Sequence, residues 1–255
     1  MTTELRIMPI TGIGEIARGI DLGKLIHDAL QDQRLTIEQG DVFVVTQKIV
    51  SKAEGQLVNL DEVEPSEFAH LAAQQSKKDA HHLEVVLRES KRIVRMDHGV
   101  IISETHHGFI CANAGVDESN IGGKRQLALL PVDSNRSARE IRTRLQQLSE
   151  KQPEPDIAVI ISDTWGRPWR TGQVNNAIGV AGMESVVDYR GQIDPYGYEL
   201  QASAIAVADE LASAAELVMG KIDQIPVALI RGYSYIPAEG DARTLIRDNT
   251  SDMFR

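Results

Sequence analysis

The chain is short of cysteine, of basic residues and of long apolar runs, and each shortage excludes a class of protein. Its single cysteine, Cys111, rules out an internal disulfide framework and agrees with a reducing compartment. No stretch approaches the roughly 18 apolar residues of a membrane-spanning helix, and the N-terminus lacks a basic-then-apolar secretion signal. We therefore expect a soluble cytoplasmic protein that does not bind membranes, with Cys111 as a small buried residue.

The charge balance restricts the partners. The 255 residues include 37 acidic and 27 basic side chains, which gives a formal net charge of -10. Such a surface disfavours nonspecific binding to nucleic acid, so an anionic ligand would need local basic groups or a metal ion. The length suits one large domain or two small interleaved ones. We predict a single domain over residues 1–255 whose partners are small charged molecules.

Familiar catalytic signatures are missing as well. The sequence has no Gly-x-x-x-x-Gly-Lys-Ser/Thr phosphate loop, no Gly-x-Ser-x-Gly nucleophile elbow and no internal repeat. His81-His82, on a predicted helix, and His106-His107, in a predicted hairpin turn, have no cysteine or carboxylate at zinc-ligand spacing. We expect these histidines at the surface and consider a hydrolase a poor interpretation.

Hydrophobic periodicity predicts an α+β fold. Strands and helices do not alternate regularly enough for a doubly wound sheet, so mixed, mainly antiparallel sheets with flanking helices are expected. Asp21 is a predicted helix cap, Pro65-Ser66 a predicted helix start and Gly220 a predicted helix end. Strands are predicted at 4–11, 42–45, 127–130, 226–231 and from 157, with short antiparallel strands within 92–115, and helices from 22, within 64–91, at 134–147 and at 200–219.

The most informative segment begins at Ile157. Its apolar, β-branched run reads as a buried strand that ends in Asp163 and Thr164, followed by Arg167 and Arg170 and by both tryptophans of the chain. A carboxylate and a hydroxyl are hard ligands suited to Mg²⁺ or Mn²⁺, and arginines match phosphate or carboxylate. The segment therefore suggests a metal-nucleotide or polyanion site. A strand followed by a Gly-Pro turn with solvated arginines is the alternative.

Other segments could complete such a site. Asp117 and Glu118, with Asn120, follow an apolar stretch and could hold divalent ions with Asp163, although acidic loops are commonly solvated turns. Phosphate-loop candidates are Thr11-Gly12-Ile13-Gly14 and Met219-Gly220-Lys221, where a simple turn and a helix cap are the alternatives. Further phosphate donors, or simply solvated strand-end groups, are Gln47, Lys48 and Lys52.

The order of these segments resembles the GTP-dependent coenzyme F420 γ-glutamyl ligases. The resemblance spans nearly the whole chain, and several unusual segments in one order are far more specific than any lone motif. The matching stretches are Thr46 to Gly55, Asn113 to Asn120, Ser162 to Gly172, Ala208 to Gly220 and Pro226 to Gly232.

This resemblance implies an activity and a fold. The family adds L-glutamate to the lactyl-phosphate side chain of the deazaflavin coenzyme, consuming GTP and releasing GDP and phosphate. The first glutamate joins through its α-amino group, and a second can be added to the γ-carboxyl of the first. The family fold has two interleaved subdomains and forms an intertwined homodimer. Some relatives carry a C-terminal flavin-binding domain, and we expect the present chain, which ends at Arg255, to be the stand-alone form.

The resemblance also implies roles for residues. Asp117 and Asp163 correspond to ligands of one divalent ion, Mg²⁺ or Mn²⁺, and Thr164 to a ligand of a second, with part of the Glu216 to Lys221 segment, notably Met219, nearby. K⁺ is a candidate activator. The expected GTP contacts are Pro9, Ile10, Thr11, Gly12, Gln47, Lys48, Lys52, Asn120, Val218, Met219, Gly220 and Lys221.

The chemistry fits these residue types. Amide formation needs an activated acyl group, and an acyl phosphate made by γ-phosphoryl transfer supplies one. We place Asp117, Asp163 and Arg167 in the catalytic set and expect Arg167 and Arg170 to bind the coenzyme's phosphodiester or glutamate carboxylates, with Glu54 and Glu118 as candidate general bases. Alternatives are another metal- and nucleotide-dependent acid-amine ligase and a non-catalytic GTP-binding module. The sequence leaves the number of added glutamates open.

Overall fold

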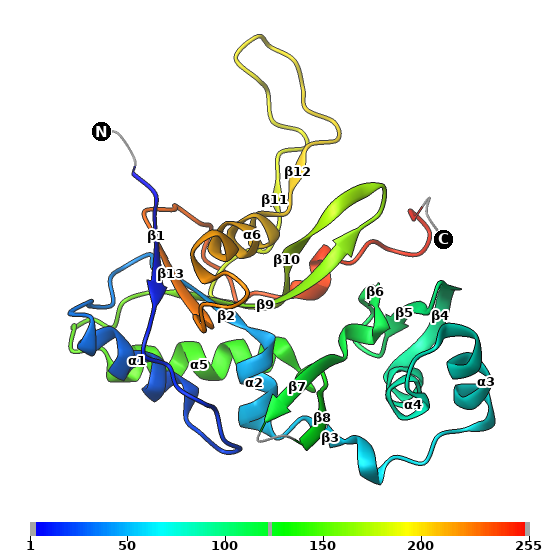
Figure 1. Ribbon diagram of the computed structural model, residues 1–255. Helices are drawn as coiled ribbons and strands as arrows, with labels where there is room; N and C mark the ends of the chain where they lie inside the picture. Colours follow the sequence, from blue (N-terminus) through cyan, green and yellow to red (C-terminus); the bar gives the residue numbers. More distant parts are fainter. Residues whose placement is uncertain (1–3, 122–123, 253–255) are drawn as a thin grey trace.

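A five-stranded sheet forms the centre of the molecule (Figure 1). The computed structural model describes residues 4–121 and 124–252. Only β2 and β9 run parallel, and the other neighbouring strands of this sheet are antiparallel. The expected mixed, mainly antiparallel α+β architecture is confirmed. The strand order is β1 (Arg6–Ile10), β13 (Val227–Arg231), β2 (Val42–Thr46), β9 (Ala158–Arg167) and β10 (Arg170–Ala181).

Helices cover both faces of this sheet. Figure 1 shows α6 (Val207–Met219) on one face and α1 (Leu22–Asp32) and α5 (Ser134–Leu148) on the other. Strands buried on two faces carry uninterrupted apolar runs, which is why β2 and the first half of β9 are almost wholly aliphatic. Phe43, Ile160 and Leu145 are fully buried in this core. The helix caps follow expectation, because Asp21 accepts a hydrogen bond from the Lys24 amide and Gly220 follows α6 at φ 61°.

Residues 57–121 and 124–128 build a smaller unit with its own apolar cluster. It follows α2 (Gln47–Glu54) and precedes α5, and its core includes Leu83, Ile101 and Leu127. It contains the sheets β3-β8-β7 and β4-β5-β6 and two α-helices. Their bounds are β3 (Leu57–Asn59), β7 (Asp117–Ile121), β8 (Lys124–Ala128), β4 (Ser90–Asp97), β5 (Val100–Thr105), β6 (Ile110–Ala112), α3 (Glu67–Ser76), α4 (Ala80–Arg88) and the 3-10 turns η1 (Leu60–Glu62) and η2 (Asn113–Gly115).

The strand that begins the informative segment does not end at Asp163, contrary to expectation. β9 continues to Arg167, turns at Pro168-Trp169 and returns as the long β10. Asp163 pairs with Asn176 across this hairpin, and Thr164 pairs with Asn175. Polar residues continue inside the two strands because this part of the hairpin faces a cavity instead of the core. A polar segment after an apolar run is also typical of a loop, which is why the sequence predicted the end of the strand too early.

The predicted helix over 200–219 is wrong at its start. α6 begins only at Val207, and Ala204–Ile205 forms strand β12, which pairs with β11 (Val187–Asp188). Backbone pairing with β11 overrides the alanine-rich helical pattern there. β11, β12 and the chain between them form an arm, residues 187–205, that projects from the body in Figure 1. The short turn η3 (Ala242–Leu245) lies near the C-terminus.

Two expectations about individual side chains have different outcomes. Cys111 is buried, as predicted. The histidines are not all at the surface: the His82 side chain is only 17% exposed, and His107 stacks on Phe109 while its Nε2 lies 2.9 Å from the Pro131 carbonyl oxygen. His82 lies beside Glu118 within the small unit, and His107 lies where that unit meets the chain that follows it. In the described part of the chain, no helix is long and apolar enough to span a membrane.

Candidate functional site

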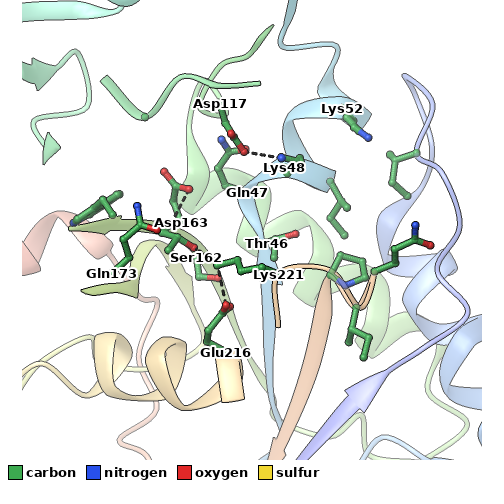
Figure 2. A pocket seen from close by; sticks show the side chains of 18 of the residues that line it. Thr46, Gln47, Lys48, Lys52, Asp117, Ser162, Asp163, Gln173, Glu216 and Lys221 are labelled. Carbon is green, nitrogen blue, oxygen red and sulfur yellow. Dashed lines mark hydrogen bonds and ion pairs between the residues drawn. The ribbon is translucent and has the colours of Figure 1, made fainter. Parts of the chain in front are cut away.

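A cavity of about 670 Å³ opens at one end of the central sheet, between the body and the small unit. Figure 2 shows that acidic and basic side chains point into it from both sides. Its walls come from the loop after β1, the start of α2, the β6–β7 segment, the β9–β10 hairpin and the chain after α6. Residues lining it include Ile13, Gly14, Glu15, Ile16, Gln47, Lys48, Lys52, Cys111, Asp117, Ser162, Asp163, Thr164, Trp165, Gln173, Glu216, Gly220 and Lys221.

Helix α2 delivers one set of donors. It begins directly after β2, with Thr46 as the extended N-cap residue, so the first turn of the helix is fixed at the carboxyl end of the middle strand of the sheet. Gln47 is buried and accepts a hydrogen bond from the Ser51 hydroxyl. Lys48 and Lys52 are four residues apart and therefore share one helix face, which is turned to the cavity.

Each of the three lysines that line the cavity has a carboxylate partner. Lys48 Nζ lies 2.7 Å from Asp117 Oδ2, Lys52 Nζ lies 3.2 Å from Glu15 Oε2, and Lys221 Nζ lies 3.1 Å from Glu216 Oε1. The pairs at Lys48 and Lys221 have partly exposed side chains, so their ions retain access to incoming ligands. A polyanion that attracts the lysines and a cation that attracts the carboxylates could separate them.

Asp163, on the opposite side of the cavity, has no ion-pair partner among the residues that the structure describes. It accepts a 2.8 Å hydrogen bond from the backbone amide of Thr164. Loss of hydration raises the pKa of Asp163 to about 7; the Thr164 amide opposes this rise, the Asp117 charge adds to it, and Lys221 and Lys48 oppose it. Two carboxylates therefore face the same space with too little positive charge between them, which is an arrangement that a bound cation would stabilise.

A chain of hydrogen bonds joins β9, β10 and α6 beside Asp163. Thr164 Oγ1 donates to Asn175 Oδ1 at 2.5 Å and accepts from Lys221 Nζ at 2.7 Å. Asn175 Nδ2 in turn donates to Glu216 Oε2 at 3.0 Å. The hydroxyl, the amide and the carboxylate thus form one connected group at the cavity wall.

The residues present fit divalent metal ions of the hard class. The described residues contain no group of three or more His, Cys, Asp and Glu side chains that could hold a metal by themselves. They offer instead the carboxylates of Asp117, Asp163 and Glu216 and the hydroxyl of Thr164, all oxygen donors on the same cavity. Mg²⁺ is commonly held by one or two carboxylates and completed by substrate phosphates and water. The donor set therefore suits a metal that arrives with a nucleotide.

Comparison with known proteins identifies the family of the chain. A profile of the F420-0:Gamma-glutamyl ligase family matches residues 12–232. The chain belongs to the F420-0:gamma-glutamyl ligase family. It is 43% identical over 251 residues to the coenzyme F420:L-glutamate ligase of Methanothermobacter thermautotrophicus, covering 97% of this chain and 96% of the relative. The corresponding ligase of Methanopyrus kandleri is 44% identical, with 98% of each chain covered, and that of Archaeoglobus fulgidus is 36% identical.

In this member of the gamma-glutamyl ligase family, several expected nucleotide contacts line the cavity and others do not. Gln47, Lys48, Lys52, Gly220 and Lys221 do. The turn formed by Pro9, Ile10, Thr11 and Gly12 is absent from the lining, and its place is taken by the next residues, Ile13 to Ile16. Ile10 is fully buried and Thr11 bonds Gln33 instead. Asn120 lies in β7, and its side chain is outside the part of the chain that the structure describes.

Two residues of α6 that were expected to contact the ligands do not line the cavity. Met219 is buried in the main core, and Val218 packs against that core; neither lines the cavity. Glu216, one turn earlier on the helix, does line it and contacts Asn175 and Lys221. The side chain of Glu216, and not that of Met219, is therefore available as an oxygen donor in the cavity. Asn175 was missed because a lone asparagine in a strand has no characteristic spacing.

The candidate bases and arginines lie in different places. Glu54 bonds the Ser137 hydroxyl and lines a second, smaller cavity, which removes it as a base for chemistry in the main cavity. Glu118 is exposed at the rim, 3.9 Å from His82 Nδ1. Arg167 and Arg170 flank the tip of the β9–β10 hairpin and do not line the cavity, whose wall includes the hairpin residues Trp165 and Gln173. In the described residues, Arg167 Nε is buried without a hydrogen-bond partner.

Proposed function

We propose that the protein is a GTP-dependent ligase that joins L-glutamate to the carboxylate of the coenzyme F420 precursor. Family membership supports the reaction class. The observation that carries the proposal is the meeting of the Asp117, Asp163, Thr164 and Glu216 oxygens with three lysines in one cavity. This combination suits a metal-bound nucleoside triphosphate better than an uncharged ligand.

The proposed chemistry proceeds in two steps. The precursor carboxylate attacks the γ-phosphorus of GTP, which forms an acyl phosphate and releases GDP. The amine of glutamate then attacks the acyl carbon, an amide bond forms, and inorganic phosphate leaves with the electrons of the broken carbon–oxygen bond. Further glutamate, γ-linked to the first, would be added by the same route.

Cavity residues would hold the reactants for this sequence. Asp117 and Asp163 would hold one divalent ion, and Thr164 with Glu216 a second; Mg²⁺ or Mn²⁺ suits these donors, and K⁺ is proposed as a monovalent activator. Bound divalent ions would neutralise the charge that develops on the transferred phosphoryl group. Freed from their carboxylate partners, Lys48 and Lys221 would donate to phosphate oxygens, as point charges on flexible stems can.

The hairpin tip is the proposed contact for the rest of the substrates. Arg167 has an unused Nε donor and Arg170 is exposed nearby, so both could bind the coenzyme's phosphodiester or the carboxylates of glutamate. Arg167→Lys should raise the KM for precursor or glutamate much more than the KM for GTP, because lysine lacks the forked geometry. Unchanged KM values for both would remove Arg167 from this role.

Mass spectrometry of the glutamate-free coenzyme tests the function. Incubation with protein, GTP, glutamate and Mg²⁺ or Mn²⁺ should add the mass of one or more glutamyl units, and omission of GTP or metal should abolish the gain. GDP release with simple carboxylates in place of the precursor would instead favour another acid-amine ligase. GTP binding without any turnover would favour a non-catalytic module and contradict the proposal.

We also propose that the protein forms a homodimer through the projecting arm. Ile193, Tyr196 and Tyr198 on this arm are 73%, 95% and 64% exposed, which is costly for apolar and aromatic side chains in water. A second copy would cover them. Light scattering coupled to size exclusion should give twice the 28.1 kDa chain mass, and Tyr196→Glu should shift the population toward monomer.

A further inference from the structure

Asn175 lies at the centre of the hydrogen-bonded group beside the cavity. It is 1% exposed, although its chain neighbours Val174 and Asn176 are partly exposed. Its side chain contacts Thr164 on β9 and Glu216 on α6, and its backbone oxygen accepts a 2.8 Å hydrogen bond from Ser213 on the same helix. One buried amide therefore joins two of the proposed metal donors.

The chemistry of the partners fixes the orientation of this amide. The Glu216 carboxylate can only accept, so the NH₂ of Asn175 must face it, 3.0 Å away. The amide oxygen then faces Thr164 Oγ1 and accepts the hydroxyl proton. Lys221, which only donates, lies 2.7 Å from the same hydroxyl oxygen. The Thr164 hydroxyl consequently directs its lone pairs, and not its proton, toward the positive charge in the cavity.

We propose that Asn175 is a positioning residue that orients Thr164 and Glu216 as acceptors for a cation. This inference rests on the proposed metal- and GTP-dependent function and deepens it by naming what sets the geometry of the second metal position. Without the amide, the Thr164 hydroxyl can rotate its proton into the cavity and Glu216 can turn toward Lys221 alone. Groups behind metal ligands typically alter metal affinity 10–100-fold.

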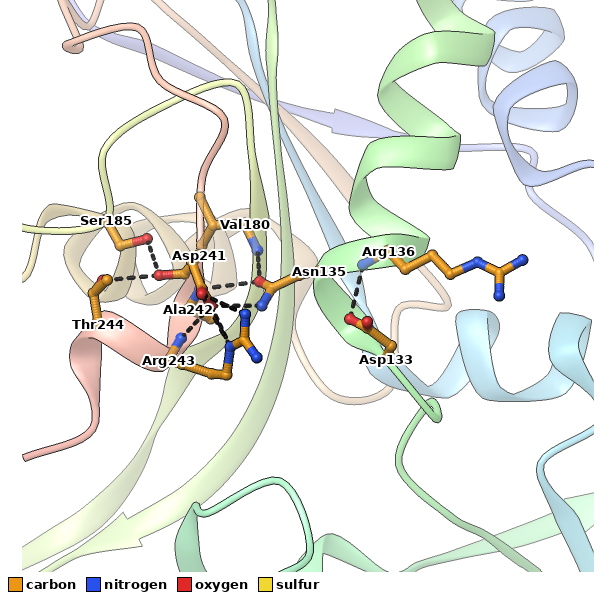
Figure 3. A network of polar contacts seen from close by, with 9 residues as sticks. All are labelled: Asp133, Asn135, Arg136, Val180, Ser185, Asp241, Ala242, Arg243 and Thr244. Carbon is orange, nitrogen blue, oxygen red and sulfur yellow. Dashed lines mark hydrogen bonds and ion pairs between the residues drawn. The ribbon is translucent and has the colours of Figure 1, made fainter.

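A second buried asparagine provides a matched control. Asn135 on α5 is 7% exposed; its Oδ1 accepts from the amides of Val180 and Ala242, and its Nδ2 donates to Asp241 at 2.7 Å (Figure 3). This network ties the C-terminal segment to the sheet and is not part of the cavity lining. Asn135 is therefore a buried and hydrogen-bonded amide like Asn175, but its substitution should affect stability alone.

The test is a direct measurement of Mn²⁺ binding in the presence of a non-hydrolysable GTP analogue. The electron paramagnetic resonance signal of free Mn²⁺ reports how much of the metal is bound. Asn175→Ala should weaken Mn²⁺ binding by about 10-fold or more. Asn135→Ala should lower the melting temperature and leave Mn²⁺ affinity unchanged.

A double-mutant cycle shows whether Asn175 acts through Thr164. Thr164→Ala removes the oriented group, so adding Asn175→Ala to it should weaken Mn²⁺ binding far less than Asn175→Ala does in the wild type. Fully additive losses would overturn the proposal. An Asn175→Ala variant that binds Mn²⁺ as tightly as the wild type would also overturn the positioning role, but it would leave the proposed function intact. A wild-type protein that binds no Mn²⁺ with the GTP analogue would overturn both.

Discussion

The two ends of the central sheet differ in how their carboxylates are neutralised. At the end where β2 begins, Asp41 is fully buried and both of its oxygens lie 2.8 Å from nitrogens of Arg231, whose guanidinium also binds Glu38. At the other end, Asp163 faces a cavity with one backbone hydrogen bond and a raised pKa. The first end is complete within the chain, and the second has the unbalanced carboxylates of a site that a ligand completes.

Removal of the Asp163 charge should have the largest effect, on activity alone. Asp163→Asn should lower kcat/KM for glutamylation by about 10³-fold, equivalent to about 4 kcal/mol of transition-state stabilisation. Stability should not fall, because the substitution removes a poorly hydrated charge.

The pH dependence of stability checks the same residue. The pKa of Asp163 is raised from 3.8 to about 7 in the folded state, so the metal-free wild type binds an extra proton between these values. Its free energy of unfolding should therefore decrease as pH rises from about 4 to about 7, and urea titrations of Asp163→Asn should lack this decrease. Equal slopes in the two proteins would show that Asp163 is already neutralised by its neighbours.

Breaking the closed end should instead destabilise the fold. Arg231→Met leaves the buried Asp41 carboxylate without its counter-ion and should lower the free energy of unfolding by about 3–5 kcal/mol. Chemical denaturation measures the loss, and activity per folded molecule should be unchanged. Arg231→Lys keeps the charge but not the fork, so it should lose less. A loss under about 1 kcal/mol for the methionine variant would refute the distinction between the two ends.

A satisfied carboxylate in the small unit should show the reverse pH dependence. Glu84 accepts hydrogen bonds from the Ser66 hydroxyl and amide and from Arg88, which lower its pKa from 4.5 to about 2. Its contribution is complete above about pH 4.5 and is lost as pH falls toward 2. Glu84→Gln should cost about 2 kcal/mol at neutral pH and flatten acid unfolding followed by circular dichroism. An unchanged acid midpoint would contradict this.

The smallest effect on stability is expected at the open end. Lys48 and Asp117 are 42% and 53% exposed, so Lys48→Met should change the free energy of unfolding by less than about 1 kcal/mol. The KM for GTP should nevertheless rise about tenfold, because a phosphate donor is lost. Steady-state kinetics at varied GTP measures this change in KM. A stability loss as large as that of Arg231→Met would contradict the view that a ligand can separate Lys48 from Asp117.

The sequence predicted the buried parts of the fold better than the walls of the cavity. The aliphatic runs of β2 and β13 and the capped helices α1 and α5 have periodicities that tertiary contacts reinforce. The β9–β10 hairpin lacks such a clear periodicity, because one of its faces carries polar residues toward the cavity. The start of α6 was misplaced because strand pairing in the arm overrides helix propensity.

The candidate site shows the same division. Acidic and basic residues next to apolar strands, such as Asp163 and Lys48, could be singled out from the order of the chain, and they do line one cavity. Asn175 could not, since its role depends on two partners that lie 11 residues before it and 41 residues after it. Met219 was favoured over Glu216 because the sequence alone does not show which face of α6 turns to the cavity.

Thermal unfolding with and without a metal-nucleotide pair tests most directly whether the open end of the sheet is completed by a ligand. Mn²⁺ together with a non-hydrolysable GTP analogue should raise the melting temperature of the wild type, since a ligand that binds only the folded state stabilises it. Asp163→Asn should show little or no rise, and Arg231→Lys should show the full rise from a lower starting point. An unchanged wild-type melting temperature, or an equal rise in Asp163→Asn, would contradict the proposed site.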